Sequence, residues 1–216
     1  MNLRTLDSHT IDLDLLPEAP TVLDVGCRWW GFVNEILALR PAARVIAMDP
    51  DPDIETEELK AMPGRTEFLC MALAASSGAM EYESYFTGVG NFLKPYGTPH
   101  LEQQAASYTA AGQGKRLVVG CVTIRDVMLL TNVKHWDVVK LDCECAEFPI
   151  LESWPGPIAT QISVEFHDYV HRTKWDARYF QGLFERLAKI GYRVVQHEDQ
   201  YVGGGWGHWD SLLALA

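Results

Sequence analysis

Short apolar runs alternate along the chain with amphipathic stretches. The runs are apolar throughout and rich in β-branched residues, which is typical of strands buried on both faces of a parallel sheet. The pattern therefore predicts an α/β fold with a doubly wound, mostly parallel seven-stranded sheet and helices on both faces. The predicted strands are residues 21–26, 43–49, 66–74, 136–142, 160–166, 192–198 and 211–216.

Helix-like stretches separate these strands. The clearest covers residues 177–190, where Phe180, Leu183 and Leu187 recur at helical spacing before Gly191, and this stripe should face the core. The last two predicted strands are joined by a short glycine-rich connection, so we expect the final strand to be antiparallel. The other predicted helices are residues 32–39, 54–61, 122–130 and 146–154.

The length of 216 residues favours a single domain that spans the whole chain, 1–216. Residues 1–20 are expected to be an N-terminal extension. Residues 85–115 are rich in Gly, Tyr, Thr and Ala without a long apolar run, so we expect an insertion or lid there.

The charge balance limits the possible partners. The net charge is −11 and no run of Lys or Arg occurs, so we expect no nucleic-acid partner. The chain contains no signal peptide pattern and no apolar run approaching the roughly 20 residues of a membrane-spanning helix. We therefore expect a cytoplasmic protein with five reduced cysteines, no membrane partner and an oligomeric state that the sequence does not indicate.

The stretch "VLDVGCRWWG", residues 22–31, predicts a strand that enters a glycine turn. Gly26 allows close backbone approach to a ligand, and Asp49 at the end of the second strand can accept both hydroxyl protons of a ribose. Nicotinamide dinucleotides and S-adenosylmethionine both carry such a ribose. The turn lacks the G-x-G-x-x-G pattern that holds a pyrophosphate, which argues against a dehydrogenase. A turn that serves only the fold is the alternative.

A series of motifs then resembles the FkbM family of class I S-adenosylmethionine-dependent methyltransferases over about residues 21–168. The motifs are "VLDVGCRWWGF", "VIAMDPDPD", "ALAASSGAMEY", "VTIRDVM", "VVKLDCECAEFPILESW" and "ISVEFHD", in this order. The resemblance implies a Rossmann-like fold, S-adenosyl-L-methionine as cofactor and O-methylation of a hydroxyl on a small molecule such as a sugar or polyketide.

The resemblance also implies roles for individual residues. The methionine half of the cofactor would lie against Asp24, Gly26 and Cys27. Asp49 would hold the ribose hydroxyls, and Met71 and Ala72 would flank the adenine ring. Asp142, Glu144 and Glu147 match the Asp-x-Glu-Gly-x-Glu signature beside the methyl group, and Glu165 and His167 match a Glu-x-His that faces the acceptor.

Two positions depart from the family pattern. Trp30 stands where the loop has its second glycine, and Gly31 follows one residue later; we expect one of Trp29 and Trp30 to pack on the sheet and the other to border the cofactor pocket. Cys145 replaces the glycine of the signature, which requires either ordinary negative φ or modest strain.

Candidate acid–base groups lie after the fourth and fifth strands of the predicted fold. His167 is the preferred base, because its unperturbed pKa lies near neutrality; Asp142, Glu144 and Glu165 are the other candidate catalytic residues. Glu147 at a helix start also suits the helix dipole. Asp142, Glu144 and Glu165 together with His167 form a possible divalent metal site, but we favour a hydrogen-bonded cluster without metal.

Three functions compete at this point. A small-molecule O-methyltransferase is preferred. A non-catalytic relative that keeps the sheet as a binding module is the second, motivated by Trp30 and Cys145. An NAD-dependent oxidoreductase is the third. Binding of S-adenosylmethionine, S-adenosylhomocysteine or NAD would separate them.

Overall fold

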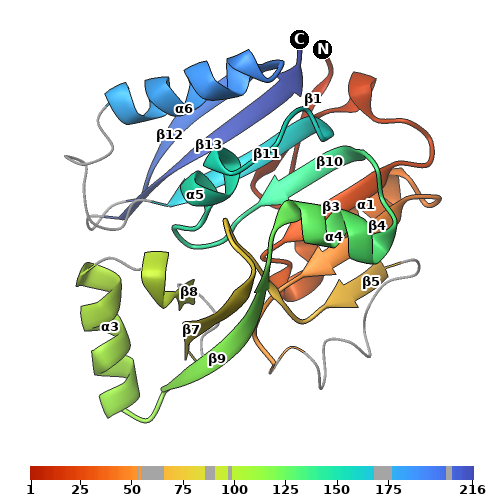
Figure 1. Cartoon of the computed structure of the whole chain (residues 1–216). Helices are drawn as coiled ribbons and strands as arrows, with labels where there is room; N and C mark the ends of the chain where they lie inside the picture. Colours follow the sequence, from red (N-terminus) through yellow and green to blue (C-terminus); the bar gives the residue numbers. More distant parts are fainter. Residues whose placement is uncertain (53, 55–65, 86–90, 97–98, 168–176, 203–205) are drawn as a thin grey trace.

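The structure, a computed structural model, describes residues 1–52, 54, 66–85, 91–96, 99–167, 177–202 and 206–216. Seven strands form the central sheet (Figure 1). Their order is β12 (Tyr192–Val202), β13 (Trp206–Leu215), β11 (Ala159–His167), β10 (Trp136–Leu141), β3 (Thr21–Val25), β4 (Arg44–Met48) and β5 (Thr66–Leu69).

The pairing of these strands confirms the predicted topology. The five strands from β11 to β5 are parallel to their neighbours, whereas β13 is antiparallel to both β11 and β12. The strand order reverses at β3, between β4 on one side and β10 on the other. In such sheets the carboxyl ends of the strands beside the reversal are the usual place for a ligand.

Helices cover both faces of the sheet (Figure 1). Alternate strand residues enter two different hydrophobic clusters, because successive side chains of a strand point to opposite faces. Leu23 and Val139 pack with α4 (Ile124–Thr131), α5 (Glu147–Glu152) and α6 (Ala177–Lys189). Val22 and Val138 pack with α1 (Gly31–Leu39). This division produces the doubly wound arrangement.

Most predicted helices are found with small shifts at their ends. Helix α6 buries Phe180, Leu183 and Leu187, as the predicted stripe requires. Helix α4 begins after Thr123, whose side chain accepts a hydrogen bond from the Asp126 backbone in a capping box. The predicted helix at 54–61 lies outside the described residues except for position 54. No helix in the described ranges is long and apolar enough to span a membrane.

The prediction of one strand over residues 66–74 is wrong. The chain leaves the central sheet after Leu69, and β6 (Ala72–Leu73) pairs with a second sheet. This four-stranded sheet has the order β6, β9 (Gly114–Val122), β7 (Gly78–Tyr85) and β8 (Phe92–Leu93). The apolar run continues through the break, so hydrophobicity alone cannot mark the change of sheet.

Residues 85–115, expected to be an insertion or lid, contain regular structure where they are described. They include β8, the 3-10 helix η4 (Lys94–Tyr96) and α3 (Pro99–Ala110), between the end of β7 and the start of β9. Residues 86–90 and 97–98 lie outside the described part. A lid function for this segment stays a prediction.

The first residues form a hairpin that packs against the sheet. Strands β1 (Leu3–Leu6) and β2 (His9–Asp12) pair in antiparallel register, and the 3-10 helix η1 (Leu13–Leu15) follows. Leu6 is fully buried. The amide of Gln161 on β11 joins the hairpin to the sheet, accepting a hydrogen bond from the Asp12 backbone at 2.8 Å and donating one to its carbonyl at 3.1 Å. The segment is thus part of the packed core.

The hairpin should contribute to the stability of the whole fold. We expect Leu6→Ala to lower the free energy of unfolding by about 2–5 kcal/mol, because it leaves a cavity in the core. Leu3, on the same strand but 43% exposed, supplies the matched control, and Leu3→Ala should change stability by only about 0.5 kcal/mol. Urea denaturation measures both. Equal, small effects would show that the hairpin is a dispensable appendage.

Candidate active site

A cavity lies at the carboxyl ends of β3, β4 and β10, where the second sheet closes its other side. Its empty space is about 620 Å³, open solvent included. This is the place where the reversal of strand order predicts a ligand. The described lining residues are Val25, Gly26, Arg28, Asp49, Pro50, Ala72, Leu73, Tyr82, Asn91, Phe92, Leu93, Asp142, Cys143, Glu144 and Ala146.

Gly26 makes the turn that brings β3 to the cavity. Its φ is +76°, and its backbone N–H donates to the carbonyl of Met48 at 2.9 Å. A Cβ atom at this position would overlap the backbone carbonyl of Asp142. Glycine is therefore required both for the left-handed conformation and for the close contact between the two strand ends.

The two tryptophans after this turn have different surroundings. Trp30 is buried and meets Phe68 edge-on at 5.9 Å, which confirms that one ring packs on the sheet. Trp29 is 62% exposed, with the guanidinium of Arg28 at 5.3 Å from its ring. It does not line the cavity, so the expectation that the second tryptophan borders the cofactor pocket is wrong. Both have positive φ in the 3-10 helix η2 (Arg28–Trp30). The displaced Gly31 makes room for the Asp7 carboxylate of the hairpin.

Asp49 is the buried acid in the cavity wall. One of its carboxylate oxygens accepts a hydrogen bond from the backbone N–H of Asp51 at 2.9 Å. Burial raises the pKa of Asp49 to about 7. The neighbouring Asp51, which sequence reasoning missed, accepts hydrogen bonds from Arg28 at 2.8 Å and from Asn91 at 3.2 Å. These contacts fix the end of β4 against the second sheet.

Three residues expected at the cofactor do not line the cavity. Cys27 is buried in the cluster around α1, and Met71 packs against the main core, whereas its neighbour Ala72 does line the cavity. Asp24 is buried below the cavity floor, with one carboxylate oxygen 3.2 Å from the ammonium nitrogen of Lys140. Its position suits an indirect role through Lys140.

Lys140 connects the two halves of the site. Its ammonium group lies 3.3 Å from a carboxylate oxygen of Asp142 and donates to the carbonyl of Gly26 at 2.6 Å. Burial opposes its charge, but Asp24 and Asp142 outweigh that effect and raise the pKa of Lys140. Burial likewise opposes the charge of Asp142, yet Lys140 and the nearby imidazoles lower the pKa of that carboxyl group. A lone lysine inside the apolar run "VVKLD" is the sequence signal for such a buried partner.

His167, the predicted base, lies at the end of β11 among carboxylates. Its Nδ1 is 3.0 Å from a carboxylate oxygen of the fully buried Glu147. Its Nε2 is 3.2 Å from Glu165, 3.7 Å from Asp142 and 3.8 Å from Glu144. The structure thus brings together all the acid–base residues predicted from the sequence. Glu147 also accepts a hydrogen bond from the Cys143 backbone, so it does more than complement the helix dipole.

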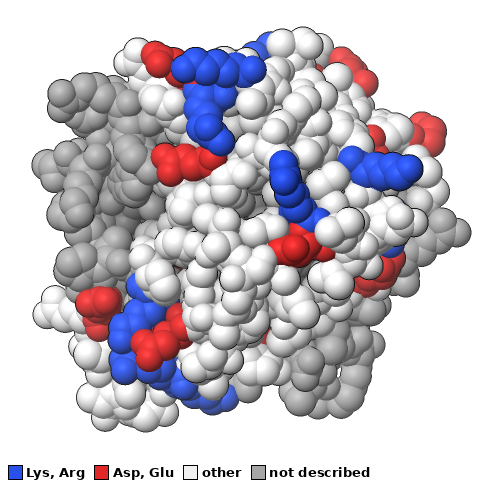
Figure 2. Space-filling view, viewed as in Figure 1, with Lys and Arg blue, Asp and Glu red and all other residues white. Residues whose placement is uncertain are grey.

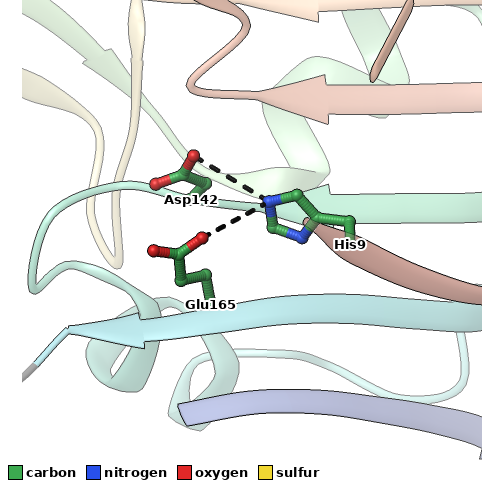
Figure 3. A group of neighbouring side chains, drawn as sticks. All are labelled: His9, Asp142 and Glu165. Carbon is green, nitrogen blue, oxygen red and sulfur yellow. Dashed lines mark ion pairs between the residues drawn. The ribbon is translucent and has the colours of Figure 1, made fainter. Parts of the chain in front are cut away.

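His9 joins this group from the N-terminal hairpin, and sequence reasoning missed it (Figure 3). Its Nε2 is 3.9 Å from Asp142 and 3.9 Å from Glu165. The ring is 2% exposed and meets Phe32 of α1 edge-on. The polar pair Asp7–Ser8 between two short runs is a signal for the hairpin, but nothing in the spacing of the residues connects His9 to the acids.

The signature after β10 adopts a strained conformation. Glu144 has a φ of +50° and Cys145 one of +78°, so the family glycine at position 145 has a physical reason. Of the two alternatives expected for Cys145, ordinary negative φ is wrong. The buried thiol of Cys145 donates to the carbonyl of His167 at 3.5 Å, which connects the strained turn to the end of β11.

The fold resembles that of solved fibrillarin structures. Fibrillarin, a pre-rRNA processing protein from Methanococcus jannaschii, is 13% identical with a TM-score of 0.52 over 99% of this chain and 70% of that chain. A fibrillarin/Nop5p complex is 10% identical, with a TM-score of 0.50 over 93% and 75%. Magnesium protoporphyrin IX methyltransferase from Synechocystis PCC 6803 with bound SAM is 11% identical, with a TM-score of 0.47 over 95% and 73%.

At these identities the structural likeness concerns the fold alone. No curated protein matches the chain significantly. A family model described as a methyltransferase FkbM domain, however, matches residues 28–194. This range begins two residues after Gly26 and contains Asp49, the signature after β10 and the end of β11. The chain therefore belongs to the FkbM family of methyltransferases.

Proposed function

We propose that this protein is an S-adenosyl-L-methionine-dependent methyltransferase that methylates a hydroxyl group of a small molecule such as a sugar or polyketide. One observation carries the proposal. A single cavity has Gly26 and Asp49 in one part of its wall and Asp142 and Glu144, from the carboxylate–histidine cluster, in another. A cofactor site and a proton-accepting site thus adjoin, as methyl transfer to a hydroxyl requires.

The residues of the cavity fit this cofactor. The backbone of Gly26 lines the cavity without a side chain, and the Asp49 carboxylate is positioned to accept hydrogen bonds from ribose hydroxyls. Ala72, Leu73 and Phe92 supply apolar surface for the adenine ring of the cofactor. No part of the turn resembles a pyrophosphate site, which agrees with a cofactor that has no phosphate.

The cluster around His167 would supply the acid–base chemistry. When bound, the cofactor supplies a methyl group on a positively charged sulfur, which passes to the acceptor oxygen. Glu147 accepts a hydrogen bond from Nδ1 of His167, which leaves Nε2 to accept the proton of the acceptor hydroxyl. Asp142, Glu144 and Glu165 surround Nε2 and stabilise the imidazolium that forms.

The charge of the protein supports a small-molecule acceptor. The net charge is −11, and Figure 2 shows Lys and Arg in small groups beside Asp and Glu on the face displayed. A nucleic-acid acceptor would need a continuous basic surface for its phosphates. An acceptor screen that follows release of S-adenosylhomocysteine should therefore respond to hydroxylated small molecules; methylation of RNA alone would contradict the proposed substrate class.

The cofactor is tested most directly by calorimetry. We expect S-adenosylmethionine and S-adenosylhomocysteine to bind and NAD not to bind. Asp49→Ala should weaken S-adenosylhomocysteine binding by about 10- to 100-fold, because hydrogen bonds to a charged acceptor are lost. Glu102→Gln, at an exposed site on α3, is the control and should bind as the wild type does. Absence of binding to either sulfur ligand would refute the proposal.

The affinity for S-adenosylhomocysteine should depend on pH through Asp49. The carboxylate, not the acid, accepts two ribose protons, so below the pKa of about 7 binding must release a proton. We expect the affinity to fall about tenfold from pH 8 to pH 6. Asp49→Asn should bind weakly and without this dependence. Asp210→Asn removes another carboxyl group whose pKa is raised to about 7, and it should keep the dependence.

His167 can be separated from cofactor binding. We expect His167→Gln to reduce turnover of an identified acceptor by about 100-fold or more, because an amide can donate to Glu147 but cannot accept the proton. S-adenosylhomocysteine should bind this variant with unchanged affinity in calorimetry. Normal turnover in the folded variant would remove His167 from the mechanism.

A further inference from the structure

The buried His9 has an unusual set of neighbours. Its Nδ1 lies 3.4 Å from the hydroxyl of Ser163, so the ring is held from one side. Its Nε2 has no hydrogen-bond partner within the described part of the chain, although it is buried. This nitrogen points instead at one oxygen of Asp142 and one of Glu165, both 3.9 Å away, as Figure 3 shows. Such a group needs a partner that fits between these three atoms.

The second oxygen of each of these carboxylates faces the other histidine. Asp142 has Oδ2 toward His9 and Oδ1 toward His167, at 3.9 and 3.7 Å. Glu165 has Oε2 toward His9 and Oε1 toward His167, at 3.9 and 3.2 Å. Two carboxylates thus lie between two imidazole nitrogens that come from opposite ends of the chain.

The cluster has an excess of negative charge. Lys140 is linked to Asp142, but the same ammonium group also neutralises Asp24. Asp210 stands opposite Glu165 in the register of β11 and β13. Five neighbouring carboxyl groups, of which Glu147 is fully buried, favour additional positive charge. The carboxylates are Asp142, Glu144, Glu147, Glu165 and Asp210.

We propose that a divalent transition-metal ion binds here, held by Nε2 of His9 and one carboxylate oxygen each of Asp142 and Glu165, whose ligand atoms all lie within 4.8 Å of one another. An octahedral ion with bonds of about 2.1 Å places adjacent ligand atoms about 3.0 Å apart and opposite ones about 4.2 Å apart. Nε2 of His9 lies 3.9 Å from an oxygen of Asp142 and 3.9 Å from an oxygen of Glu165, between these values.

The outer contact of His9 suits a metal ligand. Its Nδ1 faces the hydroxyl of Ser163. With a proton on Nδ1, the lone pair of Nε2 points at the proposed ion, which is how metal-bound imidazoles are usually oriented. Mixed imidazole and carboxylate ligands favour Mn²⁺, Fe²⁺ or Zn²⁺ over Mg²⁺ or Ca²⁺.

The site reaches the cavity through Asp142, which is 31% exposed and lines its wall beside Glu144. When bound, the ion supplies a positive charge that lowers the pKa of an acceptor hydroxyl. His167 would lie beside the ion and keep its role as the base. This role for the ion rests on the proposed methyltransferase function, whereas binding of the ion does not.

Binding of Mn²⁺ to the full-length protein tests the inference. The loss of the free-ion signal in electron paramagnetic resonance gives the dissociation constant, which we expect on the order of 10 µM. We expect His9→Gln and Glu165→Gln each to weaken binding by at least about tenfold. His135→Gln, at an exposed histidine beside Thr160, is the matched control and should bind as the wild type does.

Thermal unfolding supplies a second readout. Mn²⁺ should raise the Tm of the wild type and of His135→Gln, but not of the two cluster variants. A dissociation constant weaker than about 1 mM for the wild type, or the same constant in folded His9→Gln and Glu165→Gln, would overturn the inference.

Calorimetry with S-adenosylhomocysteine separates this result from the proposed function. Protein that binds S-adenosylhomocysteine but not Mn²⁺ would refute only the metal site. Protein that binds Mn²⁺ with the predicted dependence on His9, but neither sulfur ligand, would refute only the methyltransferase function.

Discussion

The arrangement of the site depends on the buried ammonium group of Lys140. An ammonium group has three N–H donors, and here three oxygens lie around it, from Asp24, Asp142 and the carbonyl of Gly26. Burial of such a charge is costly unless its hydrogen bonds are made, so the chain is constrained to keep all three oxygens in place. The turn after β3 and the signature after β10 are therefore held in a fixed arrangement. The two parts of the cavity wall that they form are held with them.

The sequence predicted the central strands and the grouping of acids at their ends, for one physical reason. Parallel strands present their carboxyl ends at one edge of the sheet, so Asp49, Asp142 and His167 had to lie near one another once the strands were recognised. The directions of individual side chains were predicted less well. Asp24 and Cys27 lie beside the turn as predicted but point into the protein, because the direction of each side chain depends on single residues of a turn with three left-handed positions.

Contacts between distant parts of the chain could not be predicted. His9 meets Asp142 and Glu165 because the hairpin packs on β11, where Gln161 is hydrogen-bonded to Asp12. No local sequence pattern indicates a hydrogen bond between residues 149 positions apart. The break after Leu69 was hidden for a similar reason. Ala72 and Leu73 are as apolar as the strand before them, yet they pair with β9, whose position is set by the antiparallel ladder with β7.

Trp30 and Cys145 were the two positions that motivated a non-catalytic alternative, and neither obstructs the cavity. The ring of Trp30 packs in the core below α1, where a glycine would leave a void. Gly31, one residue later, provides the space that the hairpin needs, and the hairpin carries His9. Cys145 accepts a left-handed conformation that costs roughly 1–3 kcal/mol, and its thiol contacts the backbone of His167. Each departure from the family pattern thus adjoins an element that supports the cluster.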